Sequence, residues 1–199
     1  AKIIRKSVIK LLDGLQPPLQ IKASDLETLL GSPLFRKERA LSGVGIVTGL
    51  AWTALGGATL PVEATLVHQQ NRGLKLTGQL GDVMKESVQI AISLVKIYYP
   101  DETKVLEDHD LHIHIPAGAI PKDGPSAGVT MTTAMLSAVT GIPVRPDVAM
   151  TGEVTLRGRV LAIGGLKEKL LAAKLAGMKK VLVPEENVSD VEELDAEIT

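Results

Sequence analysis

The chain has 199 residues, with 22 Lys and Arg against 23 Asp and Glu, so its formal net charge is -1 and no basic excess favours nucleic-acid binding. Cysteine is absent, which excludes disulfides, thiolate-bound zinc and a cysteine nucleophile. No apolar run approaches the roughly 18 residues of a membrane-spanning helix, so we expect no membrane partner.

Residues 1–41 predict a small helical piece. Apolar side chains recur at helical spacing over residues 3–12, and glycine and proline then end the pattern. Ser24, with Glu27 three residues later, predicts a capping box that opens a second short helix over residues 25–30. Such a piece is too short to bury a core of its own, so we expect a separate domain to begin after it.

Residues 42–199 mix strand and helix patterns and predict an α+β domain. Alternation and β-branched residues mark the strands, whereas apolar residues three and four apart mark the helices. The patterns predict strands at 44–53, 59–67, 111–115, 148–163 and 181–183, and helices at 81–99, 126–139 and 165–176. In the strand at 111–115 the alternation is strict, which places His112 and His114 opposite a buried apolar face.

A glycine-rich turn before the helix at 126–139 offers a candidate nucleophile. The five residues Gly124, Pro125, Ser126, Ala127 and Gly128 have the form of a nucleophile elbow, in which a tight turn presents a serine at the start of a helix. The free N–H groups and the dipole of that helix would favour an oxyanion. On this pattern alone, the alternative is an ordinary turn in which the serine only caps the helix.

A serine hydroxyl needs an adjacent base, and histidine is the first candidate. The four histidines, His68, His109, His112 and His114, all precede Ser126, so the order of the α/β-hydrolases is excluded. His112 or His114 remains possible as the base. The alternative is that both lie on the polar face of a surface strand.

A lysine is the second candidate base. On the helix predicted at 165–176, Lys169 lies near the middle of the apolar arc, whereas Lys167 and Lys174 lie outside it. A buried ammonium is costly unless the lysine snorkels, forms a pair or loses its proton, and the neutral amine is a general base. Thr151 and Glu153, with the two glycines before the helix, could line the same site.

Phosphate and metal sites find little support. Gly73 and Gly78 have the separation of a phosphate-binding loop, but Gln79 follows where that loop requires lysine. The two histidines of the strand at 111–115 offer two metal ligands without an obvious third. We therefore expect no metal and no cofactor in this chain.

Longer motifs resemble the proteolytic domain of Lon, the ATP-dependent protease, in its bacterial and mitochondrial type. They are PKDGPSAG at 121–128 and TGEVTLRGRVLAIGGLKEKLLAAKLAG at 151–177. Matching stretches at 49–57, 77–87 and 112–128 have the family's order and spacing, so the resemblance covers residues 42–190. Residues 1–40 resemble the end of the small helical subdomain of the AAA+ module that precedes this protease.

The resemblance assigns roles to individual residues. It implies that Ser126 is the nucleophile, that Lys169 is the base and that Thr151 hydrogen-bonds the lysine. The residues implied to support the site are Gly124, Pro125, Ala127, Glu63, Trp52 and His112. The alternative from another class is a noncatalytic interaction domain, and the distance between the serine hydroxyl and the lysine amine discriminates the two.

The resemblance also implies the setting of the domain. We expect residues 1–41 to be a remnant and linker of the ATPase module, and residues 42–199 to be a serine protease domain that is incomplete at its C-terminus. The ATPase core, with its ATP and magnesium, is expected only in a longer parent protein. That parent is expected to form a hexamer, to degrade unfolded or damaged polypeptides, and to reside in the cytoplasm or, in a eukaryote, in the mitochondrial matrix.

Overall fold

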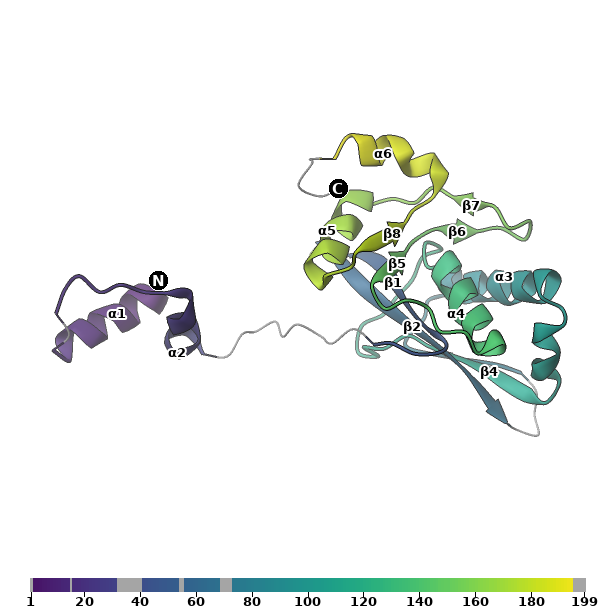
Figure 1. Cartoon of the computed structure of the whole chain (residues 1–199), viewed down its shortest axis with the longest axis horizontal. Helices are drawn as coiled ribbons and strands as arrows, with labels where there is room; N and C mark the ends of the chain where they lie inside the picture. Colours follow the sequence, from purple (N-terminus) through teal and green to yellow (C-terminus); the bar gives the residue numbers. More distant parts are fainter. Residues whose placement is uncertain (1, 15, 32–40, 54–55, 69–72, 195–199) are drawn as a thin grey trace. The chain divides into compact units, whose positions relative to one another are not determined.

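The structure is a computed structural model that describes residues 2–14, 16–31, 41–53, 56–68 and 73–194 (Figure 1). The chain divides into two compact units, Ala1–Arg39 and Ala40–Thr199. The first unit contains helix α1 (Lys2–Leu12), the 3-10 turn η1 (Ala23–Asp25) and helix α2 (Leu26–Leu30). Its assignment to the end of an ATPase module stays a prediction.

The predicted cap of the second helix is wrong. Ser24 lies inside η1, and α2 begins at Leu26 without a side-chain cap hydrogen bond. The side chain that closes the turn belongs to Asp25, whose Oδ2 accepts the Lys22 N–H at 2.8 Å. A carboxylate is a stronger acceptor than a hydroxyl, which explains why the aspartate takes this role.

A six-stranded mixed sheet organises the second unit, with the strand order β3-β4-β2-β1-β5-β8. The strands are β1 (Ile46–Thr53), β2 (Gly56–His68), β3 (Leu74–Thr77), β4 (His109–His114), β5 (Val148–Met150) and β8 (Lys180–Leu182). β2 is antiparallel to β1 and β4, whereas β3 is parallel to β4 and β5 is parallel to β1 and β8. β3 is a strand that the sequence pattern does not predict.

Helices pack on both faces of this sheet (Figure 1). Helices α3 (Asp82–Tyr98) and α4 (Gly128–Thr140) pack against each other over one face, and α5 (Leu166–Ala176) packs against β1 and β2. The α+β fold predicted from the sequence is therefore confirmed.

Two apolar clusters form the core, one on each face of the sheet. Ile113 and Val62 are fully buried in the larger cluster, together with Met131 of α4. Leu50 belongs to the smaller cluster, where it packs with Ala173 of α5. Successive strand residues thus point to opposite buried layers, as the period of two requires.

Helix α5 lies directly on the backbone of β2. A Cβ atom at Gly57 would lie 1.9 Å from the carbonyl oxygen of Glu168, so only glycine permits this approach. The contact fixes how closely α5 approaches β2 at Glu168, the residue before Lys169.

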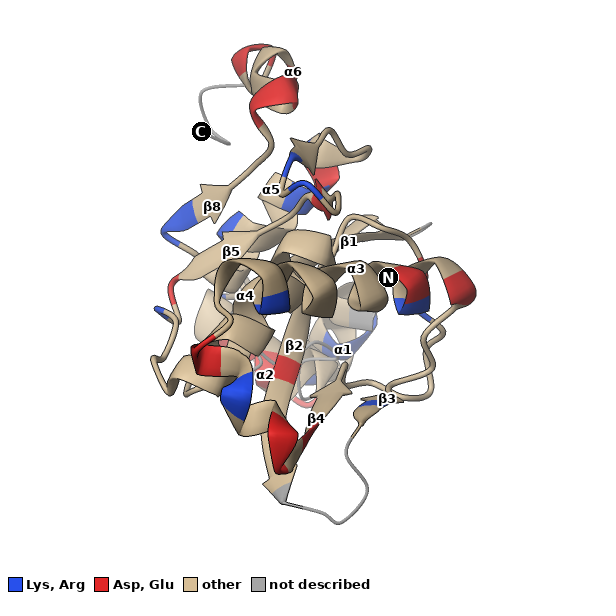
Figure 2. Ribbon diagram, turned by 90° about the vertical axis from the view of Figure 1, so that its right-hand side faces the viewer, with Lys and Arg blue, Asp and Glu red and all other residues tan. Residues whose placement is uncertain are grey.

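The C-terminal part adds the hairpin of β6 (Glu153–Val154) and β7 (Val160–Leu161), the 3-10 turn η3 (Glu185–Asn187) and helix α6 (Val188–Glu192). Figure 2 shows basic residues on β8 and acidic residues on α6, with charges of both signs interspersed over the ribbon. Within the described ranges no helix is both long and apolar enough to cross a bilayer.

Candidate active site

The loop before Ser126 is fixed by Lys122. Its Nζ donates to three backbone carbonyl oxygens, those of Gly78 at 2.9 Å, Ala117 at 2.8 Å and Ile120 at 2.9 Å. Partial burial lowers the pKa of Lys122. The three donor sites of an ammonium are thereby matched, and the loop is tied to the sheet edge.

Asp123 fixes the turn itself. Its Oδ1 accepts the N–H of Met84, in the first turn of α3, and the N–H of Gly124, each at 2.9 Å. One carboxylate oxygen thus joins the turn to the first turn of α3. Ser126 therefore follows a turn that is bonded to α3 through Asp123 and to Gly78, just after β3, through Lys122.

Helix α4 begins at Gly128, two residues later than the pattern predicts. Its N-cap residue is Ala127, which makes no side-chain cap hydrogen bond, so Ser126 does not cap the helix. The chain turns tightly here because the Gly128 N–H donates to the Pro125 carbonyl oxygen at 3.0 Å. The Ser126 side chain lines a cleft instead.

Lys169 of α5 meets this serine. Its Nζ lies 3.0 Å from Ser126 Oγ, a hydrogen-bonding distance. Lys169 is only 3% exposed, whereas Lys167 and Lys174 on the same helix are exposed. The prediction that Lys169 faces the apolar side of its helix is confirmed.

Thr151 completes the group. It follows β5, is 1% exposed, and its Oγ1 lies 3.4 Å from Lys169 Nζ. The same hydroxyl donates to the Ser126 carbonyl oxygen at 3.2 Å, and the Thr151 N–H donates to the Leu182 carbonyl oxygen at 3.1 Å. The threonine thus links the serine, the lysine and the edge strand β8.

Burial lowers the pKa of Lys169, because its ammonium form loses hydration. Among the described residues no carboxylate forms an ion pair with Lys169, so no opposite charge raises the pKa again. The neutral amine is therefore more populated near neutral pH than in a lysine with the ordinary pKa of about 10.4.

Some of the helix N–H groups expected to bind an oxyanion are already hydrogen-bonded within the chain. The N–H of Gly128 is used in the tight turn, and the N–H of Val129 donates to the Gly152 carbonyl oxygen at 3.0 Å. Across the described ranges, the N–H groups of Ser126 and Ala127 have no acceptor. These two groups are the candidate donors to a developing oxyanion.

The cleft above the dyad has a volume of about 600 Å³. Its walls come from β1, the elbow and the segment that leads into α5. The residues that line it include Leu50, Ala51, Trp52, Leu60, Met84, Asp123, Pro125, Ser126, Ala127, Glu153, Ala162, Ile163, Gly164, Gly165, Glu168 and Lys169. Its largely apolar lining and open form suit an extended peptide.

Of two residues that the resemblance implies as supports of the site, Trp52 lines the cleft and Glu63 does not. Trp52 lines the cleft, is 63% exposed, and packs so close to Gly165 that a Cβ there would lie 2.9 Å from its ring. Glu63 lies in β2, paired with Ile46 on one side and His114 on the other, and is not part of the cleft lining. In the described part of the chain no hydrogen bond or ion pair joins it to the serine or the lysine.

The two strand histidines are engaged elsewhere. Thr77 Oγ1 lies 3.0 Å from His112 Nε2 and 2.7 Å from His114 Nδ1. Neither histidine lines the cleft, and in the described part of the chain no hydrogen bond joins either one to Ser126 or Lys169. Among the described residues, no group of three His, Asp or Glu side chains has the geometry of a metal site.

Sequence reasoning missed the residues that support the elbow and the cleft wall. Lys122 and Asp123 stand within the quoted motif, and the Asp-Gly pair is a turn signal that could have indicated Asp123. Asn187 precedes α6, where asparagine is usually a cap, and this position gives no hint of its partner Ile163.

A model of the family described as "Lon protease (S16) C-terminal proteolytic domain" matches residues 20–199. A Lon protease of Lachnoclostridium phytofermentans is 57% identical over 189 residues, covering 92% of this chain and 23% of the relative. Lon proteases of Geobacter metallireducens and Rhizobium meliloti are 52% and 50% identical, with 98% and 97% of this chain covered, and 24% of each relative. The chain thus spans about a quarter of the length of the curated relatives it matches.

Proposed function

This chain belongs to the Lon protease (S16) family, whose members are serine peptidases, and we propose that it hydrolyses peptide bonds through an acyl-enzyme on Ser126. The observation that carries the proposal is the buried Lys169, whose Nζ lies 3.0 Å from Ser126 Oγ. The proteolytic domain of this family needs no cofactor.

Proton positions favour lysine as the base. Thr151 has one hydroxyl proton, and it is directed to the Ser126 carbonyl oxygen at 3.2 Å, so Thr151 Oγ1 can only accept a hydrogen bond from Lys169. With one amine N–H directed to Thr151, the lone pair of the neutral amine is available to the Ser126 hydroxyl proton. Lys169 then takes that proton as Oγ attacks the peptide carbonyl.

The first half-reaction uses two sets of groups: backbone N–H groups of the elbow and the amine of Lys169. The carbonyl oxygen of the substrate becomes an oxyanion, to which the N–H groups of Ser126 and Ala127 donate. As the tetrahedral intermediate collapses, the ammonium of Lys169 gives its proton to the leaving amine, and the acyl group stays on Oγ.

The second half-reaction reuses the same base. A water molecule enters the vacated side of the cleft and gives a proton to neutral Lys169 as its oxygen attacks the acyl carbonyl. The ester bond breaks, Ser126 Oγ recovers its proton from Lys169, and the carboxylic acid product leaves.

The wider setting belongs to the parent protein. We propose unfolded polypeptides as substrates, since the cleft is open and suits an extended chain. We further propose that a separate ATPase module, with ATP and magnesium, delivers those chains, that the parent assembles as a hexamer, and that it acts in the cytoplasm or the mitochondrial matrix. Glu63 and His112 are retained only as supporting residues outside the cleft.

Covalent labelling tests the central step. A small fluorophosphonate should phosphonylate Ser126 Oγ with loss of fluoride, which intact-protein mass and peptide mapping would locate. Ser126→Ala should abolish both labelling and peptide hydrolysis, whereas Ser93→Ala, at a helix serine bonded to the Gln89 carbonyl oxygen, should keep both. Undiminished hydrolysis by a folded Ser126→Ala protein would refute the proposal.

A further inference from the structure

We propose that Asn187 is a positioning residue for peptide binding, because it holds the backbone of Ile163 that forms one wall of the active-site cleft. The inference rests on the proposed peptidase function. It concerns how substrate is held, not how Ser126 is activated.

The amide of Asn187 pairs with Ile163 as a neighbouring strand would. Its Oδ1 accepts the Ile163 N–H at 2.9 Å, and its Nδ2 donates to the Ile163 carbonyl oxygen at 3.0 Å. Nδ2 also donates to Asp190 Oδ2 at 2.6 Å. Asn187 is 3% exposed, so these bonds form away from water, where losing one leaves a buried polar group without a partner.

Asn187 bonds Ile163 in place of the helix N–H groups that an asparagine at its position normally bonds. It is the N-cap residue of α6, a position at which asparagine normally bonds the helix N–H groups, yet it makes no side-chain cap hydrogen bond. Its side chain reaches instead across 24 positions of sequence to the segment before α5. A residue that served only to begin a helix would not need this contact.

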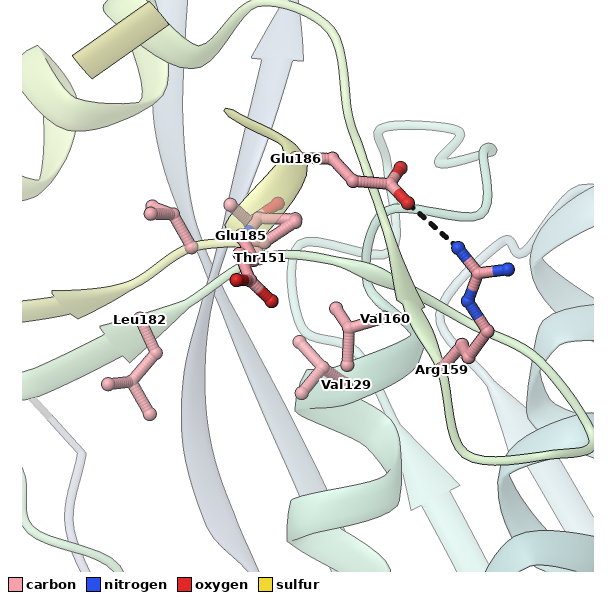
Figure 3. Close-up of a pocket in the computed structure, with 9 residues that line it drawn as sticks. Val129, Thr151, Arg159, Val160, Leu182, Glu185 and Glu186 are labelled. Atoms are coloured by element: carbon pink, nitrogen blue, oxygen red, sulfur yellow. Dashed lines mark hydrogen bonds and ion pairs between the residues drawn. The ribbon is translucent and has the colours of Figure 1, made fainter. Parts of the chain in front are cut away.

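Glu186, the preceding residue, holds the same segment. Its Oε1 accepts a hydrogen bond from Arg159 Nη2 at 2.9 Å, which Figure 3 shows across the neighbouring pocket. Its Oε2 accepts the Ala162 N–H at 3.3 Å. The turn η3 therefore bonds one residue before β7, Arg159, and two residues after its end at Leu161, Ala162 and Ile163.

The position of this anchor explains its effect on substrate. Ala162, Ile163 and the two following glycines line the cleft, so the anchored backbone is the wall against which a peptide lies. Ile163, held by Asn187, is the last residue before Gly164 and Gly165, which carry no side chain to hold them.

The dyad is fixed by other contacts. Helix α5 is held against β2 at Gly57, and Ser126 is held through Thr151 and the Gly152 N–H, which donates to the Ser126 carbonyl oxygen at 2.8 Å. Loosening the wall should therefore weaken peptide binding while leaving the reactivity of Ser126 nearly intact.

Asn187→Ala in the full chain tests this separation, with Asp190→Ala as the matched control. The control removes the third partner of Asn187 at an exposed position and leaves both bonds to Ile163. For a short fluorogenic peptide, Asn187→Ala, which loses both bonds to Ile163, should raise KM about tenfold, with kcat within about threefold. Labelling by a small fluorophosphonate, which has no peptide to bind, should stay within about twofold of the wild type, and the control should match the wild type throughout.

A second variant keeps the test decisive if Asn187→Ala fails to fold. Asn187→Asp keeps the acceptor for the Ile163 N–H but turns an oxygen toward the Ile163 carbonyl, so KM should again rise. An unchanged KM in a folded variant, or labelling that falls in proportion to peptide hydrolysis, would overturn the positioning role. Failure of the wild type to label would instead refute the proposed peptidase function.

Discussion

Replacing Lys169 with methionine should inactivate the protein and stabilise it at the same time. The lysine is 3% exposed, burial lowers its pKa, and within the described ranges it has no carboxylate partner. Methionine has a similar length and flexibility but no charge to dehydrate. The exchange leaves no buried orphan, because Thr151 still donates to the Ser126 carbonyl oxygen and Ser126 Oγ lines the open cleft.

The size of the gain follows from linkage. Every unit by which burial lowers the lysine pKa costs the folded wild type about 1.4 kcal/mol at a pH below the folded pKa, where both states are protonated. This cost shrinks as pH rises from the folded pKa toward the unfolded value of about 10.4, since the unfolded chain binds more protons in that window. Each kcal/mol recovered should raise Tm by about 2–4 °C in a chain of this size.

Urea unfolding of wild type and Lys169→Met, followed by circular dichroism between pH 6 and pH 10, measures this difference. We expect the variant to be more stable at neutral pH, with an advantage that diminishes toward alkaline pH, and to have no detectable peptidase activity. A folded Lys169→Met protein that is less stable than the wild type at neutral pH, or an advantage that grows with pH, would contradict the argument from desolvation.

Three further outcomes are expected. Peptide hydrolysis should rise with pH through a single ionisation below the ordinary lysine value, because neutral Lys169 is the active form; maximal kcat/KM at pH 5 to 6 in folded protein would exclude it. His112→Ala and His114→Ala should each keep peptidase activity within a few-fold, because both rings contact Thr77, and loss of activity in a folded variant would reopen the histidine alternative. Gly57→Ala should lower the unfolding free energy by about 1–3 kcal/mol, since its Cβ would meet the α5 backbone; a melting temperature equal to wild type would show that α5 can shift.

Sequence reasoning succeeded where one periodicity dominates. The strict alternation around Ile113 identifies β4 because one face of that strand is fully buried. The apolar arc of α5 identifies Lys169 as a buried cation, since a lysine on that face departs from the pattern of its own helix. In both cases the signal is local and recurs every two or every three to four residues.

Other features depend on contacts that no local pattern contains. The pairing of Asn187 with Ile163 joins two irregular segments, and neither has a period. The histidines of β4 find Thr77 only because the unpredicted strand β3 lies beside them. The start of α4 at Gly128 reflects a tight turn that uses an N–H which helix rules would leave free.

The bond between the Thr151 N–H and the Leu182 carbonyl oxygen makes the site's threonine depend on strand β8. β8 pairs in parallel with β5, and β5 with β1, so closing this part of the sheet joins segments far apart in the chain. Such non-local parallel pairings are slow to form, because the entropy of closing a long loop must be lost first. Thr151 therefore acquires this backbone hydrogen bond only when β8 is in place beside β5.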